Sequence, residues 1–413
     1  MIELKQDKER VILVGVELPG EESMEDSLSE LSELATTAGA ETVGRVLQNR
    51  EQVHPGTYVG KGKIEEIKDL LWELEATGII CDDELSPAQM KNLQDELNVK
   101  VMDRTLLILD IFAARASTSE GKIQVELAQL KYRQTRLTGF GTAMSRLGGG
   151  IGTRGPGEKK LEMDRRLIKS RIAALNRELK EVKRHREVTR EQRSKSYVPV
   201  VAIVGYTNAG KSTLLNRLTG ADILAEDKLF ATLDPTTRGL KLPGGQEVLL
   251  TDTVGFIKKL PHHLIEAFKS TLEEAKYADV ILHVVDTSSP QMDSQMYTVY
   301  ETLSNLGVKD KAIITAFNKQ DKLEDAPLIR DFKADYTVKI SAKTGAGLTD
   351  LTDTMEAVLR EQKVFLECLY EYQDAAKIQL IRKYGELLEE KYQEDGIFVR
   401  AYVPAELYSR VTV

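Results

Sequence analysis

The sequence predicts a multidomain α/β protein, and three patterns lead to that fold class. Short apolar runs alternate with helical patterns over residues 1–115. A long uninterrupted helical pattern runs from Glu158 to Lys195. The apolar run 198–204 then leads directly into the segment GYTNAGKS, which another helical pattern follows. With about 100–200 residues in a typical domain, a chain of 413 residues has room for several domains.

Composition and charge are those of a soluble globular protein. The chain is 41% hydrophobic and 30% charged, and its formal net charge is −8, so bulk charge gives no reason to expect nucleic acid. Cys81 and Cys368 lie far apart in the sequence, and we expect reduced thiols rather than a disulfide or a metal site. The first ten residues are rich in charged side chains and lack the apolar core of a secretory signal. No apolar run in the sequence approaches the roughly 18 residues that a membrane-spanning helix needs. We therefore expect a cytoplasmic protein without a membrane span.

The first expected domain, residues 1–115, is a small α/β domain. Residues 10–18, 78–85 and 99–104 have the composition of strands, and residues 63–78 follow a helical pattern with apolar residues on one face. Because strands separated by helices pair in parallel, this domain is predicted to contain a parallel sheet.

Residues 116–196 are predicted to form a helical hairpin linker. Its arms are the helical patterns 120–137 and 158–195, and in the second arm Leu161, Ile168, Leu175 and Val182 are seven residues apart. That arm contains fourteen Lys and Arg residues against seven acidic residues, inside a chain that is acidic overall. A charged helix face is often only solvated, but this local excess favours a polyanion as partner.

Two glycine-rich segments imitate nucleotide-binding motifs. Residues 58–63 (YVGKGK) follow no convincing apolar strand, so we interpret them as a turn that opens a helix; a second nucleotide site there stays an alternative. The spacing Gly150-x-Gly152-x-x-Gly155 matches a dinucleotide fingerprint, but a helix precedes it where that fingerprint requires a strand.

The glycine-rich loop 139–157 therefore has another purpose. It holds eight glycines in nineteen residues and no acidic residue, together with Arg146 and Arg154. A flexible connector is one interpretation. We favour an RNA contact, because glycine allows close backbone approach and arginine can stack on bases or pair with phosphate.

The strongest motif opens the third expected domain, residues 197–362. Gly205-x-x-x-x-Gly210-Lys211-Ser212 follows a buried strand and precedes a helix, which is the setting that a phosphate loop requires. The loop's backbone N–H groups and the helix N-terminus bind phosphates. Lys211 is expected to reach the β- and γ-phosphates, and the Ser212 hydroxyl to bind Mg²⁺.

Three downstream segments identify the base and the switches. Asn318-Lys319-Gln320-Asp321 follows an apolar strand, where a carboxylate can accept both N–H groups of guanine, and a backbone N–H of Ser341-Ala342-Lys343 can meet its O6. Asp252-x-x-Gly255 ends another strand, so Asp252 is expected to hold Mg²⁺ through water and the Gly255 N–H to sense the γ-phosphate. In this order the set predicts a P-loop GTPase domain with a mixed, mostly parallel sheet and helices on both faces.

Two segments of this part of the chain leave alternatives. The stretch 229–238 offers Thr232, Thr236 and Thr237 as rival threonines for the metal. Phe256 stands where many GTPases place a water-orienting glutamine, so it is either a packed switch residue or a sign of slow intrinsic hydrolysis.

The last expected domain, residues 363–413, is a small α+β tail. It begins as a helix-rich stretch, most periodic over 386–392, and ends in a strand over 396–404.

The chain closely resembles the HflX family of ribosome-associated GTPases over nearly its whole length. The segments that carry this resemblance are 55–68, 103–132, 146–166 and 229–238. Lys159, where a threonine is expected, is the one visible departure, and it leaves the glycine loop unchanged. The resemblance implies an N-terminal α/β domain, a helical linker, a GTPase domain and a small C-terminal domain. It also implies that Thr232 is the switch threonine on Mg²⁺ and that residues 230–234 line the nucleotide.

From the motifs and the resemblance together we expect Lys211, Thr232, Asp252 and Gly255 to be catalytic and Ser212 and Thr232 to bind Mg²⁺. The residues expected to contact the nucleotide are Gly205, Tyr206, Thr207, Asn208, Ala209, Gly210, Lys211, Ser212, Thr213, Phe230, Ala231, Thr232, Leu233, Asp234, Asp252, Thr253, Val254, Gly255, Asn318, Lys319, Asp321, Ser341, Ala342 and Lys343.

The expected function is that of a monomeric GTP-hydrolysing switch. The resemblance implies that the GTP form binds the large ribosomal subunit and its RNA, with a role in ribosome splitting, rescue or assembly. The alternatives are a GTP-gated module that binds a protein through the hairpin and an RNA-remodelling NTPase.

Overall fold

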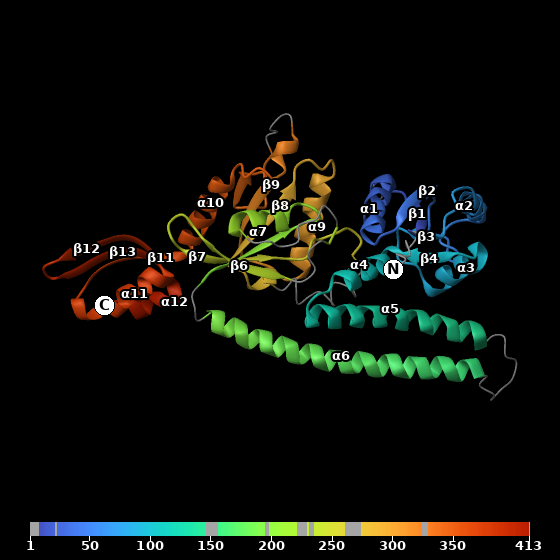
Figure 1. Cartoon of the computed structure of the whole chain (residues 1–413), viewed down its shortest axis with the longest axis horizontal. Helices are drawn as coiled ribbons and strands as arrows, with labels where there is room; N and C mark the ends of the chain where they lie inside the picture. The colour runs from blue at the N-terminus through green and yellow to red at the C-terminus, as the bar shows by residue number, and fades with distance from the viewer. Residues whose placement is uncertain are drawn as a thin grey trace, which may run out of the picture. The chain divides into compact units, whose positions relative to one another are not determined.

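The computed structural model describes residues 8–20, 23–145, 156–194, 198–220, 229–230, 235–260, 274–323 and 329–412 (Figure 1). It divides into two compact units, one made of Met1–Val182 with Lys259–Phe268 and the other of Lys183–Lys258 with Lys269–Val413. Within the part of the chain that the structure describes, no helix is long and apolar enough to cross a membrane.

The N-terminal domain contains a four-stranded sheet in the order β2-β1-β3-β4, with every pair of neighbours parallel. Its elements are β1 (Arg10–Glu17), α1 (Met24–Thr37), β2 (Glu41–Asn49), α2 (Lys61–Glu73), β3 (Gly78–Cys81), α3 (Pro87–Leu97), β4 (Lys100–Asp103) and α4 (Arg104–Arg115). Helices cover the sheet, so six consecutive residues of β1 are buried where a one-sided strand would alternate. The predicted parallel α/β domain is confirmed.

Local signals account for the helix starts in this domain. Ser86 and Gln89 form a capping box at α3, and Pro87 occupies its first turn, where a missing N–H costs nothing. Helix α2 begins after Gly60, whose N–H donates to Gln48 Oε1 at 2.9 Å. The interpretation of YVGKGK as a turn that opens a helix is confirmed.

The linker consists of two long helices, α5 (Ser119–Ser145) and α6 (Pro156–Ser194), which lie side by side in Figure 1. Leu127 and Leu175 are buried, and Arg171 donates two hydrogen bonds, of 2.7 and 2.8 Å, to the carboxylate of Glu126. The predicted hairpin arms are therefore present. Residues 146–155, including Arg146 and Arg154, lie outside the described residues.

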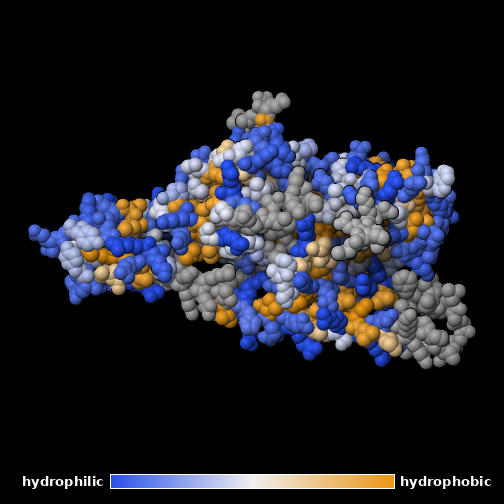
Figure 2. All heavy atoms as spheres, viewed as in Figure 1, coloured by the Kyte–Doolittle hydropathy of each residue, from blue (hydrophilic) through white to orange (hydrophobic). Residues whose placement is uncertain are grey.

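The surface of this helical pair is mixed in character. Figure 2 shows hydrophobic residues, in orange, among hydrophilic ones along it, and Met163 and Leu167 are among the large exposed hydrophobic residues.

The central domain is built on a six-stranded sheet in the order β10-β9-β8-β5-β7-β6. Its strands are β5 (Val200–Gly205), β6 (Thr236–Lys241), β7 (Glu247–Asp252), β8 (Val280–Asp286), β9 (Ala312–Asn318) and β10 (Tyr336–Lys339). Among these described strands, only β6 is antiparallel to its neighbour. The main helices are α7 (Lys211–Thr219), α9 (Met292–Asn305) and α10 (Leu348–Glu361). Apolar residues of α7 and α10 join the sheet in one core, and α9 packs on β5 and β8. The predicted mixed, mostly parallel sheet is confirmed.

The C-terminal tail is a three-stranded antiparallel sheet in the order β11-β13-β12 with two helices. It contains β11 (Lys363–Tyr370), α11 (Ala375–Tyr384), β12 (Glu386–Gln393), β13 (Gly396–Pro404) and α12 (Ala405–Val411). The α+β class is as predicted, but the helical assignment of 386–392 is wrong. Pairing with β13 overrides the helix propensity of these Leu, Glu and Lys residues.

Candidate nucleotide-binding site

The phosphate loop joins β5 to α7 through backbone conformations that glycine permits. A Cβ on Gly205 would lie 2.3 Å from the Val284 carbonyl oxygen. Gly210 has φ +96° and caps α7, and a Cβ there would lie 2.3 Å from Asn318 Nδ2. Both glycines are therefore required by close approach of the chain, and helix α7 begins directly after them, where a helix N-terminus favours an anion.

Lys211, at the first turn of α7, is buried and folds back over the loop. Its Nζ donates to the carbonyl oxygens of Gly205 at 3.1 Å and Tyr206 at 2.7 Å. Burial lowers the pKa of Lys211 to about 8, Asp252 acts in the opposite direction, and Lys319 lowers it further. The loop thus holds one ammonium group that gains a strong electrostatic stabilisation from any phosphate placed beside it.

Ser212 and Asp252 meet at the carboxyl end of β7. The Ser212 hydroxyl donates to Asp252 Oδ2 at 2.7 Å, and Asp252 is fully buried. A hydroxyl and a carboxylate side by side are hard oxygen ligands of the kind that Mg²⁺ takes, directly or through water. The residues present here fit that ion.

The segment after Asp252 packs directly on the phosphate loop. The Thr207 N–H donates to the Phe256 carbonyl at 2.8 Å, and the Phe256 N–H donates to the Gly205 carbonyl at 3.1 Å. A Cβ on Gly255 would lie 2.9 Å from the backbone Cα of Thr207, so the close approach of these two segments requires glycine, and Lys211 Nζ lies 3.0 Å from the same point. The Phe256 side chain is buried, which agrees with its interpretation as a packed switch residue.

Asn318, at the end of β9, bridges two of the predicted motifs. Its Nδ2 donates to the Ala209 carbonyl of the phosphate loop at 2.8 Å, and its Oδ1 accepts from the Ala342 N–H at 2.9 Å. The Asn318 side chain therefore fixes the spacing between the loop for phosphate and the loop expected to contact guanine. In the described arrangement the Ala342 N–H is bonded to Asn318.

Asp321 is exposed and stands beside the same loop. Its Oδ1 accepts from the Ser341 hydroxyl at 2.6 Å, and this bond is the main reason that its pKa lies below the ordinary value. Burial opposes this shift, and the charges of Lys343 and Lys322 add to it. The group is therefore an ionised acceptor at neutral pH, as guanine recognition needs.

The structure also shows where the remaining predicted residues lie. Thr207, Asn208, Ala209, Thr213, Thr253, Val254, Lys319 and Lys343 belong to the segments just described or flank them. Phe230 is buried, whereas Ala231, Thr232, Leu233 and Asp234 lie outside the described residues. Thr236 and Thr237 belong to β6, and the Thr237 hydroxyl is 3.0 Å from that of Thr251, so this rival has a partner within the sheet.

The sequence reasoning did not single out Asp286, which pairs with a residue of the predicted base motif. It ends β8, and its Oδ2 lies 2.7 Å from Lys319 Nζ. The available signal was its position at the carboxyl end of a buried parallel strand, beside strands that already carried motifs.

The chain matches family models and known relatives. Three family models match the chain in succession: GTP-binding GTPase N-terminal over residues 25–113, GTP-binding GTPase middle region over 115–193, and 50S ribosome-binding GTPase over 200–319. A solved structure of a GTP-binding protein from Sulfolobus solfataricus in complex with GDP is similar at 25% identity, covering 85% of this chain and 99% of that one, with a TM-score of 0.45.

Relatives named GTPase HflX match at higher identity. The protein from Lacrimispora saccharolytica is 70% identical over 409 residues, which are 99% of this chain and 97% of that protein. The protein from Escherichia coli is 45% identical over 346 residues, covering 83% and 81%. This chain therefore belongs to the HflX family of GTPases, and the reaction at its phosphate loop is the hydrolysis of GTP.

Proposed function

We propose that this GTPase is a switch that binds the large ribosomal subunit and its RNA in the GTP form and leaves after hydrolysis. Such a cycle would serve ribosome splitting, rescue or assembly. The supporting observation is a basic helix in a family whose GTPase-domain model is described as a 50S ribosome-binding GTPase. In this cycle, GTP binding allows the chain to bind the large subunit, and GTP hydrolysis limits the lifetime of that complex.

The site residues divide the work by position. Lys211 would bind the β- and γ-phosphates, and Ser212, Thr232 and Asp252 would hold Mg²⁺. Bound Mg²⁺ would neutralise negative charge on the phosphates. The Gly255 N–H donates to the γ-phosphate, so the segment that follows it reports which nucleotide is present.

The remaining motifs select the base. The Asp321 carboxylate accepts from the two N–H groups on the edge of guanine. Asn318 keeps the phosphate loop and the loop 341–343 at the spacing that GDP and GTP require, because it bonds to both loops.

Hydrolysis by the chain alone is proposed to be slow. Phe256 is buried and its side chain has no hydrogen-bond donor or acceptor to orient the attacking water. A group from the ribosome or from another part of the chain then supplies that orientation. Equal turnover of GTP with and without ribosomes would contradict this part of the proposal.

Helix α6 is the proposed contact to ribosomal RNA among the described residues. Lys169, Arg177, Lys180 and Arg184 are exposed along it. Neutralising phosphates with such side chains releases counterions, so binding of this kind weakens steeply as salt increases. Arg146 and Arg154 of the glycine-rich loop are proposed to extend the same contact.

Co-sedimentation with large ribosomal subunits tests the proposal. We expect retention with a non-hydrolysable GTP analogue and release with GDP. The triple variant Lys169→Ala, Lys180→Ala, Arg184→Ala should bind more weakly and with a smaller salt dependence. The matched control removes the same number of exposed charges elsewhere, at Lys100, Lys333 and Lys391. Equal binding in both nucleotide states would refute the switch, and equal loss in both triple variants would refute the assignment to α6.

A further inference from the structure

An acidic pair occupies the carboxyl edge of the N-terminal sheet. Asp82 and Asp83 directly follow β3, which pairs with β1 at the centre of the strand order. In open parallel sheets this edge, where neighbouring connections leave in opposite directions, is where ligands bind. Asp82 is completely buried, so its charge needs partners of opposite sign.

One of those partners is built into the domain. Arg104, itself buried, donates from Nη2 to Asp82 Oδ1 at 2.8 Å, and its Nη1 lies 3.6 Å from Glu30 Oε2. The Ser27 hydroxyl donates to Asp82 Oδ2 at 2.8 Å. Arg104 pairs with Asp82, and the adjacent Asp83 places a second carboxylate beside this pair. Two neighbouring carboxylates at one sheet edge favour a further cation beside them.

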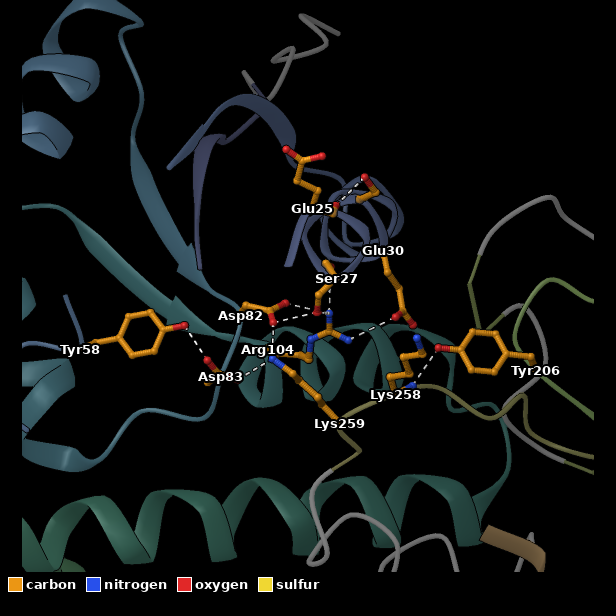
Figure 3. A network of polar contacts seen from close by, with 11 residues as sticks. Glu25, Ser27, Glu30, Tyr58, Asp82, Asp83, Arg104, Tyr206, Lys258 and Lys259 are labelled. Atoms are coloured by element: carbon orange, nitrogen blue, oxygen red, sulfur yellow. Dashed lines mark hydrogen bonds and ion pairs between the residues drawn. The ribbon is translucent and has the colours of Figure 1, made fainter. Parts of the chain in front are cut away.

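Lys259 supplies that cation (Figure 3). Its Nζ lies 2.5 Å from Asp82 Oδ2 and 2.6 Å from Asp83 Oδ1. The Tyr58 hydroxyl donates to Asp83 Oδ2 at 2.7 Å, which orients that carboxylate toward the lysine. Burial alone would lower the pKa of Lys259, but the charges of Asp82 and Asp83 raise it. Two oriented carboxylates thus bind one ammonium group. By its contacts, Lys259 belongs to the same compact unit as Asp82 and Asp83, the unit that contains Met1–Val182.

In the sequence, Lys259 lies far from the N-terminal domain, because it is the fourth residue after Gly255. Its backbone has φ +53°, a left-handed conformation that is uncommon for a non-glycine residue and has to be held by its surroundings. The preceding residue, Lys258, donates its N–H to the Tyr206 hydroxyl at 2.9 Å. A short stretch of chain therefore separates the residue that senses the γ-phosphate from the lysine on the acidic pair.

The described position of this stretch conflicts with a γ-phosphate. Gly255 lies against Lys211 Nζ, and the Phe256 carbonyl accepts from the Thr207 N–H. A phosphate placed between Lys211 and the Gly255 N–H requires Gly255 to move away from the loop. Only three residues separate Gly255 from Lys259, and an extended residue spans at most about 3.6 Å, so the docked lysine limits how far Gly255 can move away from the loop.

We propose that Asp82 and Asp83 are a docking site for the Lys259 ammonium and hold residues 255–259 in an arrangement that excludes the γ-phosphate. GTP then competes with this docking, whereas GDP does not. The N-terminal domain thereby biases the nucleotide preference of the chain before any ribosome is present. This inference goes beyond the proposed ribosomal role and does not depend on it.

The test is a double-mutant cycle on the full chain without ribosomes. Equilibrium titrations give the affinities for GDP and for a non-hydrolysable GTP analogue in Lys259→Met, Asp83→Asn and the double variant. Lys259→Arg keeps the charge. The control pair is Lys100→Met and Glu9→Gln, because Lys100 Nζ also makes two short contacts, both 2.9 Å, to a carboxylate of the same domain.

Each single variant should raise the affinity for the analogue relative to GDP by about fivefold, the effect of losing one partly exposed ion pair. The double variant should add little to either, and Lys259→Arg should stay near the wild type. The control pair should leave the ratio unchanged. An unchanged ratio in Lys259→Met would overturn the proposal. So would a change in Lys259→Met that Asp83→Asn does not reproduce, or additive effects in the double variant, since a merely structural role predicts those.

Discussion

Substituting Gly210 by alanine should damage nucleotide binding through one identified collision. The new Cβ would lie 2.3 Å from Asn318 Nδ2, a distance that the packed side chain must relieve by moving. Moving Asn318 breaks its bonds to the Ala209 carbonyl and the Ala342 N–H, at about 1 kcal/mol each. A left-handed alanine costs roughly 1–2 kcal/mol more. The total is about 3–4 kcal/mol.

Gly220→Ala is the matched control for this prediction. Gly220 caps the other end of α7 with φ +66°, and nothing lies within 4 Å of a Cβ placed there. It therefore carries the same backbone cost, roughly 1–2 kcal/mol, without the collision.

The assay is isothermal titration with GDP, together with thermal unfolding of both variants. If the phosphate loop of Gly210→Ala relaxes in the free protein, GDP binding has to restore the strained loop, and the affinity for GDP falls by roughly 100- to 1000-fold. If the loop keeps the described conformation in the free protein, the same free energy lowers the unfolding midpoint instead. Gly220→Ala should bind GDP within about twofold of the wild type. Equal GDP affinity and equal unfolding midpoints in the two variants would refute the reasoning about Asn318.

Three further outcomes are expected. Ser212→Ala should remove the stimulation of GDP binding by Mg²⁺, measured against EDTA, because the hydroxyl 2.7 Å from Asp252 Oδ2 is lost; undiminished stimulation would contradict the metal assignment. Asp321→Asn should reduce the preference for GTP over xanthosine triphosphate by about tenfold or more in a competition assay, since an amide no longer accepts both guanine N–H groups. Burial lowers the pKa of His283 to about 4 from an ordinary 6.5, so the unfolded chain is protonated first as pH falls. The free energy of unfolding should then decrease by about 3 kcal/mol from pH 6.5 to 4, and the midpoint of His283→Asn should change less over that window.

Much of the nucleotide site could be predicted because its motifs are local. The run from β5 through Gly210 and Lys211 into α7 is continuous in sequence, and each residue type there answers a backbone or charge requirement. The family adds Thr232, which the residue pattern alone left among rivals. The exact domain limits at 116, 197 and 363, and the roles of the site residues, stay predictions.

The parts that sequence reasoning missed depend on contacts between distant positions. Lys259 and Asp82 are 177 residues apart, and no motif or periodicity links them. In the tail, Glu386 begins β12 as a buried carboxylate paired with Arg360, a residue of α10. A window of Leu, Glu and Lys cannot reveal that partner, so the local helix propensity decided the wrong assignment.

The position of Asn318 sets a limit on how this enzyme can be redesigned. Engineering a new base preference usually means exchanging the residues that touch the base and leaving the rest untouched. Here one amide group fastens the base loop to the phosphate loop, so a transplanted base loop would also need an N–H at position 342 that donates to Asn318 Oδ1. Base selectivity and phosphate affinity are consequently linked in this protein, so a substitution that changes one is expected to change the other.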